Sequence, residues 1–295
     1  MPETPRWLSD DARIDLHTHS RCSDGTTTVA ELVRRAAESG LDAIALTDHD
    51  TVAGWDEAAR AARAHGIAVV PGIEVSTEYR HFSVHVLAIL PDPSAGTALA
   101  EELSRARASR DGRARAMVER LGADYPITWE DVAAQVAGEN TTVGRPHIAD
   151  ALVACGVVPD RSAAFGEVLS PQGPYYVRHY APAPDVAVRA IADAGGVSIA
   201  AHPASGMRGG QVPDGLLESM IASGLGGIEV DHREHDDVAR ARLRDLTRAS
   251  DLIVTGGSDY HGAGKPNALG ENLTAPAALS ALIERAASRT EVLLP

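Results

Sequence analysis

Short apolar segments alternate with amphipathic segments along most of the chain. The apolar segments are rich in Val, Ile, Leu and Ala and are bounded by turn-forming residues, which is typical of buried strands. Seven strands are predicted on this basis, at 13–16, 43–46, 68–70, 84–89, 197–201, 227–230 and 252–255. Because strands that alternate with helices usually pair in parallel, the pattern predicts an α/β protein with a mostly parallel sheet.

Helical periodicity follows the first two strands. Segment 28–39 has apolar residues at three- and four-residue spacing and is followed by Gly40, a residue type that favours the end of a helix. The same unit recurs at 55–64, and another helix at 185–194 precedes the fifth strand. The length of 295 residues fits one α/β barrel that carries an insertion.

The strand pattern stops after residue 90 and returns near residue 185. Between these points, apolar residues follow helical spacing at 97–121, 128–136, 146–154 and 162–169. A stretch of this length with its own helices is not a loop, so we expect a helical insertion domain at 91–184. We expect a discontinuous barrel made of 12–90 and 185–275, with 276–295 forming a C-terminal helix that packs on it.

Composition narrows the classes of function. The 27 basic and 41 acidic side chains give a net charge of −14, which opposes extended binding to a phosphate backbone, and the arginines of 105–120 are expected on a solvated helix face. Two cysteines without a partner motif, no signal segment and no long apolar span favour a cytoplasmic protein without membrane attachment. No protein partner is indicated.

Nine residues of metal-ligating type stand at or beside the C-terminal ends of the predicted strands. They are His17, His19, Asp24, His49, Glu74, His85, His202, Asp259 and His261. In barrels of parallel strands this face carries the chemistry. Imidazole and carboxylate together suit zinc, manganese or iron, and nine ligands are too many for one ion. The sequence therefore predicts a polynuclear metal site.

The spacing of these residues supports shared ions. His17 and His19 alternate along an extended segment and so face the same side, and Asp259 and His261 repeat that geometry. Glu74 has two oxygens and can bridge two ions. Two bridged ions activate water and stabilise both the entering and the leaving oxygen of an in-line displacement, which favours phosphate ester hydrolysis.

A second group of residues lies in the expected insertion. Pro146 marks the first turn of a helix, with Arg145 and His147 on either side of it. A helix N-terminus already attracts anions, so these two side chains predict a phosphate clamp. Three further basic residues are candidates for contact with a phosphate: Lys265, Arg178 and Arg208.

Four sequence blocks, taken in order, resemble the PHP family, the polymerase and histidinol phosphatase superfamily. The blocks are His17-Thr18-His19, Thr47-Asp48-His49, His202-Pro203 and Ser258-Asp259-Tyr260-His261. With Glu74 and His85 the resemblance covers residues 14–274. Ser23-Asp24-Gly25 and Gly144-Arg145-Pro146-His147 make the chain most similar to the stand-alone nucleoside 3′,5′-bisphosphate phosphatases and a related 5′-to-3′ exoribonuclease.

The resemblance implies a distorted (β/α)7 TIM-like barrel and two to three divalent ions, manganese, iron or zinc. It implies a first ion held by His17, His19, Glu74 and Asp259, a second by Glu74, His85 and His202, and a third by Asp24, His49 and His261. Many members have histidine where this chain has Asp24, and an oxygen ligand there favours manganese or iron over zinc.

The resemblance also implies a mechanism, attack by a metal-bridging hydroxide with Arg145 and His147 on a substrate phosphate. Asp48 and His232 are candidates for the acid that protonates the leaving group, although Asp48 could instead orient a metal-bound histidine.

The expected activity is metal-dependent hydrolysis of a phosphate monoester of a small nucleotide, with the 3′-phosphate of nucleoside 3′,5′-bisphosphates favoured. Trimming of short RNA from its 5′ end is a related activity, and a small nucleotide or short RNA is the expected partner. The alternatives are another phosphomonoesterase, such as a histidinol-phosphate phosphatase, C–N bond hydrolysis, or a non-catalytic regulatory PHP domain. The last would predict eroded ligands, and all nine positions are intact.

Overall fold

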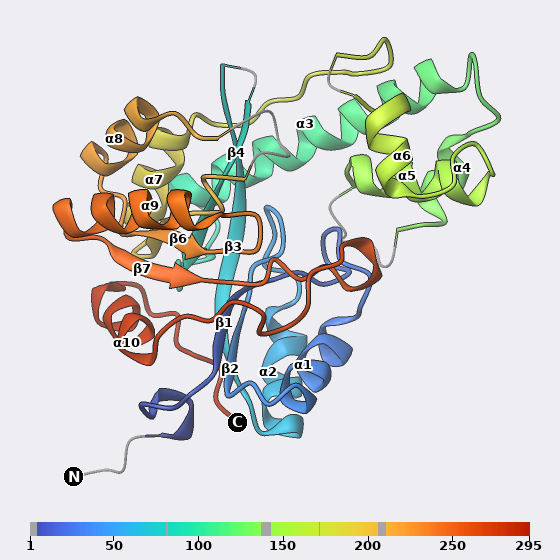
Figure 1. Cartoon of the computed structure of the whole chain (residues 1–295). Coiled ribbons are helices and arrows are strands. Elements are labelled where there is room, and N and C mark those ends of the chain that lie inside the picture. The colour runs from blue at the N-terminus through green and yellow to red at the C-terminus, as the bar shows by residue number, and fades with distance from the viewer. Residues whose placement is uncertain (1–4, 81, 137–142, 171, 206–210) are drawn as a thin grey trace.

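The computed structural model describes residues 5–80, 82–136, 143–170, 172–205 and 211–295. Its described strands form one sheet in chain order, which curls into a nearly closed barrel (Figure 1). They are β1 (Ile14–Thr18), β2 (Ala43–Leu46), β3 (Ala68–Tyr79), β4 (Phe82–Ile89), β5 (Val197–Ala200), β6 (Gly227–Asp231) and β7 (Ile253–Gly256). A bridge from Thr18 to Tyr260 brings the two ends of the sheet together. The predicted seven-stranded α/β barrel is confirmed.

One strand departs from the expected parallel order. β4 pairs antiparallel with both β3 and β5, whereas the other neighbouring strands pair in parallel. The reason is that β3 extends to Tyr79, which lies opposite Phe82 at the start of β4. The two residues between them are too few for the crossover that a parallel neighbour requires.

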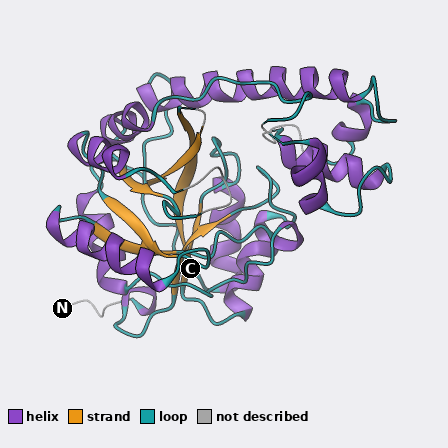
Figure 2. Ribbon diagram, turned by 45° about the horizontal axis from the view of Figure 1, so that its top comes forward, coloured by secondary structure: helices purple, strands orange, loops and turns teal. Residues whose placement is uncertain are grey.

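Helices surround the barrel (Figure 2). They are α1 (Val29–Glu38), α2 (Trp55–His65), α7 (Pro184–Asp193), α8 (Asp214–Ala222), α9 (Asp237–Ala249) and α10 (Pro276–Arg285), with short turns η1 (Arg6–Leu8) and η3 (Gly262–Gly264). Local sequence sets their ends. Thr28 accepts a hydrogen bond from the backbone N–H of Glu31 at the start of α1. Gly66 ends α2 at φ 68°, a conformation that disfavours side chains.

Strand alternation divides the barrel into an apolar interior and an apolar outer layer. Interior residues of the lower barrel include Ala43 and Ala45 of β2, while the intervening Ile44 packs outward against α1 and α2. At the end of the barrel where the strands begin, Leu279 and Leu282 of α10 join the interior cluster and are fully buried. α10 therefore closes the barrel end opposite the C-terminal ends of the parallel strands.

The segment between β4 and α7 is helical in its described parts. It contains α3 (Ala98–Leu121), α4 (Trp129–Ala133), α5 (Arg145–Ala154), α6 (Arg161–Ala163) and η2 (Ala164–Val168). Leu99 and Leu103 at the start of α3 pack with the barrel layer, whereas Met117 and Leu121 near its end belong to a separate apolar cluster with α5. The long helix α3 thus connects the barrel to a lobe formed by α4, α5 and α6 (Figure 1).

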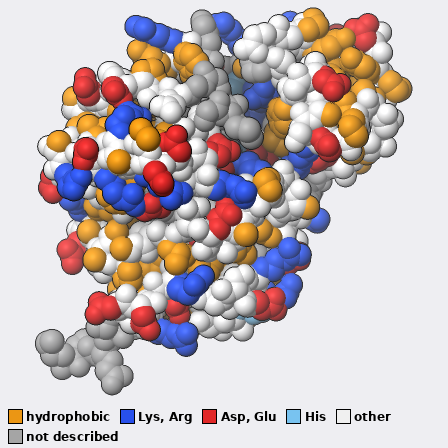
Figure 3. Space-filling model, viewed as in Figure 1, with side chains coloured by type: hydrophobic (Ala, Val, Ile, Leu, Met, Phe, Trp, Pro, Cys, Tyr) orange, Lys and Arg blue, Asp and Glu red, His pale blue; other side chains and the backbone are white. Residues whose placement is uncertain are grey.

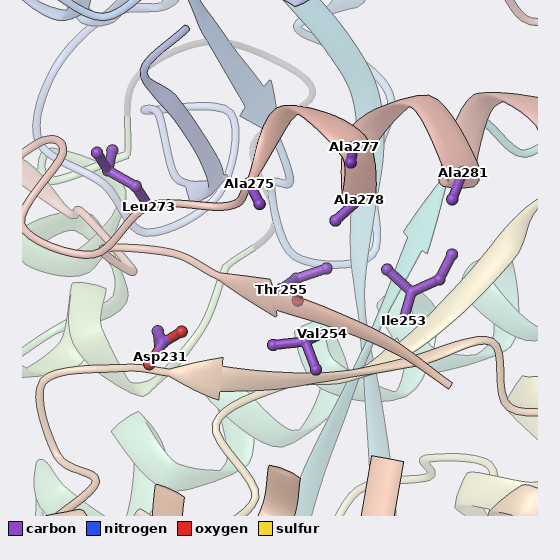
Figure 4. Close-up of a pocket in the computed structure, with 9 residues that line it drawn as sticks. All are labelled: Asp231, Ile253, Val254, Thr255, Leu273, Ala275, Ala277, Ala278 and Ala281. Atoms are coloured by element: carbon purple, nitrogen blue, oxygen red, sulfur yellow. The ribbon is translucent and has the colours of Figure 1, made fainter. Parts of the chain in front are cut away.

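A groove of ≈ 420 Å³ lies outside the barrel, between β7 and α10 (Figure 4). Its walls are mainly Ala, Val, Leu and Ile side chains, and its carboxylate, Asp231, is bound by Arg244 at 2.6 Å. Its other polar side chain, Thr255, donates a hydrogen bond to the carbonyl of Ile228, so both polar groups have partners within the fold. Within the described parts of the chain, none of the helices combines the length and apolar character that crossing a membrane requires.

The closure of the barrel by α10 predicts a stability effect. Leu279→Ala should lower the free energy of unfolding by about 2–5 kcal/mol, because it opens a cavity beneath the interior cluster. Urea unfolding followed by circular dichroism measures the change. Leu294→Ala is the matched control, since Leu294 is 55% exposed. Equal midpoints for the two variants would mean that α10 does not seal the interior.

Candidate metal centre

Strand alternation points two of the predicted ligands into the barrel. Glu74 continues the inward-facing positions of Ala68 and Val70 on β3, and His85 shares its parity with Leu87 and Ile89 on β4. His85 stands near the start of its strand, which corrects the expectation of a strand end. Because β4 is antiparallel, its start lies on the same rim as the C-terminal ends of the parallel strands.

Glu74 is the centre of the site and is fully buried. Its Oε2 lies 3.2 Å from Nε2 of His17 and 3.0 Å from Nε2 of His19. Its Oε1 lies 2.5 Å from Nδ1 of His85 and 3.1 Å from Nε2 of His202. One carboxylate oxygen therefore faces imidazole nitrogens at the end of β1, and the other faces those of β4 and of the residue after β5, as a bridging ligand requires.

The structure brings the candidate ligands together in three overlapping groups whose ligand atoms lie within 4.8 Å of one another. The groups are His17, His19, Glu74 and Asp259; His49, Glu74 and His85; and His19, Asp24, His49 and His261. The first matches the set that the family resemblance implies for one ion. In the second, His49 replaces His202, which nevertheless remains beside Glu74, and the third gains His19.

The unsatisfied atoms of these side chains fit metal ions. Nε2 of His17, His19 and His261 and Oε2 of Glu74 are buried and lack a hydrogen-bond partner within the part of the chain described. Leaving such atoms unpaired costs free energy in a folded protein, whereas a cation would satisfy all of them at once. The donor set of nitrogen and carboxylate oxygen suits manganese, iron or zinc.

The electrostatics of the centre agree with a place for cations. Burial opposes a charge on His17, yet Glu229, Glu74 and Asp259 raise its pKa well above the usual value. Burial likewise opposes a charge on His19, but the neighbouring carboxylates of Asp259 and Glu74 raise its pKa to about 9. The carboxylates of the cluster thus favour positive charge strongly enough to overcome desolvation.

Glu229 on β6 contacts the candidate ligands, and the sequence did not reveal it. Its Oε1 lies 3.0 Å from Nδ1 of His17, and its Oε2 accepts a hydrogen bond from the backbone N–H of His202 at 2.7 Å. Burial raises its pKa, but His17 and other histidines lower it to about 2. An ionised Glu229 therefore fixes the ring of His17 with Nε2 facing the centre. The available signal was a carboxylate at an inward-facing strand position.

Backbone contacts fix the position of β1 at the centre. Asp15 is buried and accepts hydrogen bonds from the backbone N–H groups of Ser258, Gly270 and His17. These bonds tie β1 to the segment after β7. At Gly257 a Cβ atom would lie 2.4 Å from Cβ of His17, so that position requires glycine.

The two candidate acids differ in their surroundings. Asp48 accepts hydrogen bonds from the hydroxyls of Ser20 and Ser23, each at 2.6 Å, and from the backbone of Ser20. His232 is buried, and its Nδ1 accepts a hydrogen bond from the backbone N–H of Glu234, which leaves the proton on Nε2. That Nε2 lies 3.9 Å from Oδ2 of Asp259.

The basic candidates are distributed unevenly. Lys265 lies against the centre, with Nζ 2.5 Å from Oδ2 of Asp259. Arg178 is exposed, whereas the adjacent His179 lies 3.1 Å from Arg113. Arg208 falls outside the described residues. Lys265 therefore contributes charge to the centre itself.

The start of α5 lies close to the metal centre. His147 is 5% exposed, its Nδ1 accepts a hydrogen bond from the backbone N–H of Gly144, and it also hydrogen-bonds with the backbone of Ser23. Arg145 donates to the carbonyl of Leu169 at 3.2 Å. The insertion thus contacts the loop that carries Asp24 through His147.

The arginines of α3 were expected on a solvated face, and for two of them this is wrong. Arg110 is 9% exposed and Arg113 is 7% exposed. Arg110 forms an ion pair with Oδ2 of Asp50 at 2.6 Å and also donates to Ser76. Asp50 directly follows His49, so this pair joins α3 to the segment that carries a candidate ligand.

Comparison with known proteins identifies close similarity over most of the chain. The PHP domain matches residues 15–141. The chain is 37% identical to the 3′,5′-nucleoside bisphosphate phosphatase of Chromobacterium violaceum, over 86% of this chain and 89% of that protein. It is 34% identical to the 5′-3′ exoribonuclease of Haemophilus influenzae, over 84% of this chain and 90% of that protein.

Two further comparisons extend this result. The chain is 34% identical to the phosphoribosyl 1,2-cyclic phosphate 1,2-diphosphodiesterase of Eggerthella lenta, over 84% of this chain and 94% of that protein. A crystal structure described as a metal-dependent phosphoesterase of Bifidobacterium adolescentis superposes with a TM-score of 0.91 at 44% identity, over 97% of this chain and 99% of that one.

The contact between Glu229 and His17 predicts an effect on metal binding. Glu229→Gln should weaken binding of manganese about 10–100-fold, because the amide no longer fixes the charge and orientation of the imidazole. Isothermal titration of the metal-free protein with manganese measures this affinity. Glu218→Gln on the exposed face of α8 is the control. An unchanged affinity in Glu229→Gln would show that Glu229 does not contribute to metal binding.

Proposed function

The chain belongs to the PHP family of metal-dependent phosphoesterases, and from that premise we propose that it hydrolyses the 3′-phosphate of nucleoside 3′,5′-bisphosphates. The observation that carries the proposal is the contact of His147, at the start of α5, with the loop beside Asp24. Through this contact, a group that can bind phosphate adjoins the candidate metal ligands. The 37% identity to a bisphosphate phosphatase supports the same substrate class.

We propose the three groups around Glu74 as the ligands of two to three divalent ions. His202, 3.1 Å from Glu74, joins the ion held by His85. The oxygen of Asp24 in the third group favours manganese or iron over zinc. Bound ions of this kind supply Lewis acidity and an activated water at neutral pH.

The residues of the chain then orient and neutralise the substrate. Arg145 binds phosphate oxygens, His147 does so in exchange for its hydrogen bond with the backbone of Ser23, and burial of the histidines around Glu74 limits the access of bulk water. Lys265 holds Oδ2 of Asp259 and so directs its other oxygen, Oδ1, toward His17 and His19. These contacts fix the ligand atoms before a substrate arrives.

His232 is a better candidate than Asp48 for the proton donor to the leaving group. Asp48 already accepts hydrogen bonds from Ser20 and Ser23, and Ser23 in turn contacts the ring of His19. Asp48 therefore positions the loop that follows β1. His232 carries its proton on Nε2, the nitrogen nearer to Asp259. A neutral imidazole with that tautomer can stabilise the leaving oxygen by donating a hydrogen bond from Nε2 at the edge of the centre, and its protonated form can transfer a proton there.

Several features favour a small substrate. The net charge of −14 and the presence of only two Phe oppose a long single-stranded nucleic acid, although trimming of short RNA stays compatible with the 34% identity to an exoribonuclease. A histidinol phosphate carries one phosphate and would leave part of the insertion's charge unused.

We assign residues 91–184 to an insertion domain that binds substrate, and we place the protein in the cytoplasm.

A substrate panel tests the proposed function. With manganese, the protein should release phosphate from adenosine 3′,5′-bisphosphate and leave adenosine 5′-monophosphate, faster than it releases phosphate from histidinol phosphate or nucleotides from a 5′-phosphorylated short RNA. Ion-exchange chromatography and a phosphate assay follow the products. A chelator should abolish turnover and added manganese should restore it. Preferred turnover of histidinol phosphate, or no turnover at confirmed metal content, would refute the proposal.

A further inference from the structure

Arg113 on α3 is a buried cation whose surroundings are unusual. Its guanidinium donates from Nη1 to Nδ1 of His179 at 3.1 Å and also hydrogen-bonds with Tyr176. Its Nε is buried and lacks a hydrogen-bond partner among the residues that the structure describes. Among the described residues, no carboxylate forms an ion pair with Arg113. A guanidinium that is 7% exposed is thus held mainly by neutral groups.

Two further arginines crowd the same place. Burial, together with the charges of Arg110 and Arg145, lowers the pKa of Arg113 to about 9. Burial also lowers the pKa of His179 to about 3, with the same arginines contributing. His179 is therefore neutral at pH 7. Because an arginine always donates, Nδ1 of His179 accepts from Arg113, and Nε2 of His179 carries a proton that it can donate.

The other two arginines already have fixed places. Arg110 is neutralised by Asp50. The guanidinium of Arg145 lies over the rings of Phe165 and Tyr176, at 5.4 and 5.7 Å from their centroids, and donates to a carbonyl. These contacts hold Arg145 in one orientation beside Arg113. The positions of these side chains are thus fixed, and in the part of the chain that the structure describes no carboxylate forms an ion pair with Arg113.

A purely structural role does not explain this arrangement. Burying a guanidinium without an anionic partner costs several kcal/mol, and a neutral side chain could make the packing contacts of Arg113 without that cost. Residues that destabilise the fold in this way are typical of binding sites, where a ligand supplies the missing charge. An anion with several acceptor oxygens would match the guanidinium of Arg113 and the N–H of His179.

The cluster flanks the metal centre on the side of the insertion. Arg110 contacts Asp50, the neighbour of His49. Arg145 is two residues from His147, which reaches the loop of Asp24. Figure 3 shows basic side chains in the recess between the lobe of α4 to α6 and the barrel. A ligand that reaches both the ions and this cluster would need anionic groups at both ends.

We propose that Arg113, with Arg145 and the N–H of His179, forms a socket for the second phosphate of the substrate, the one that is not hydrolysed. The inference rests on the proposed function in that the substrate carries two phosphates. It goes beyond that function by assigning recognition of the retained phosphate to α3 and to the segment around His179. The socket thereby determines the preference for a bisphosphate over a monophosphate.

Binding of adenosine 5′-monophosphate tests the socket without turnover. Isothermal titration of the manganese-loaded protein should show that Arg113→Met weakens binding about 10–100-fold, since it removes charge-assisted hydrogen bonds. Arg115→Met is the matched control, because Arg115 lies two residues along α3, is exposed and stacks on Trp129. Equal affinities for the two variants would overturn the proposal.

Kinetics give a second measurement. The ratio of kcat/KM for adenosine 3′,5′-bisphosphate to that for adenosine 3′-monophosphate should fall about 10–100-fold in Arg113→Met and stay unchanged in Arg115→Met. Normal bisphosphate turnover with an unchanged ratio would refute the socket and leave the proposed function intact. Conversely, weaker binding of adenosine 5′-monophosphate to Arg113→Met, in a protein that never turns over the bisphosphate, would support the socket as a nucleotide phosphate site and refute the proposed function.

Thermal stability separates binding from a structural role. Without phosphate or sulfate in the buffer, Arg113→Met should melt at a higher temperature than the unmodified protein, because it removes a buried charge that lacks an anion. Adenosine 5′-monophosphate should stabilise the unmodified protein more than the variant. A variant that melts at a lower temperature, or that does not fold, would show that Arg113 is a structural residue and would overturn the socket.

Discussion

The fold depends on a buried carboxylate, Glu74, surrounded by imidazoles that come from separate strands. Removing this group from water is costly, and burial raises its pKa, but the facing histidines His85, His49 and His17 lower it well below the usual value. The barrel must therefore close for the charge of Glu74 to be tolerated. Closure of the barrel and assembly of the metal centre therefore depend on each other, because each buried ligand needs its neighbours to offset the cost of its desolvation.

Strand alternation serves both the core and the centre. The positions that bury Ala68 and Val70 low in the barrel continue upward to Glu74, so one register places apolar packing below and ligands above. The reversal of β4 preserves this arrangement, since the start of an antiparallel strand meets the ends of its parallel neighbours. His85 thus reaches Glu74 from a strand of opposite direction.

The sequence was informative where the signal is local. Strand period and the short spacing of His17 and His19 indicated the seven strands and the candidate ligands, because both depend on a few consecutive residues. Glu229 was missed because a single carboxylate in an apolar run has no local partner. Its partner His17 lies 212 residues away in the chain. The direction of β4 depended on how far β3 extends, which period alone does not determine.

Arg110 and Arg113 were misjudged for the same reason. On a helix, arginine normally faces water, and their neighbours Asp50 and His179 are distant in sequence. The burial of these arginines changes what the overall charge implies for binding. A protein of charge −14 repels long polyanions at a distance, whereas the buried Arg113 and the proposed ions of the centre would attract phosphate at short range. Such a combination favours small anions, which can enter the recess. It disfavours long nucleic acids, which the net negative charge of the protein repels. The proposed selectivity for a compact nucleotide thus depends on where the positive charge is buried, which the net charge alone does not indicate.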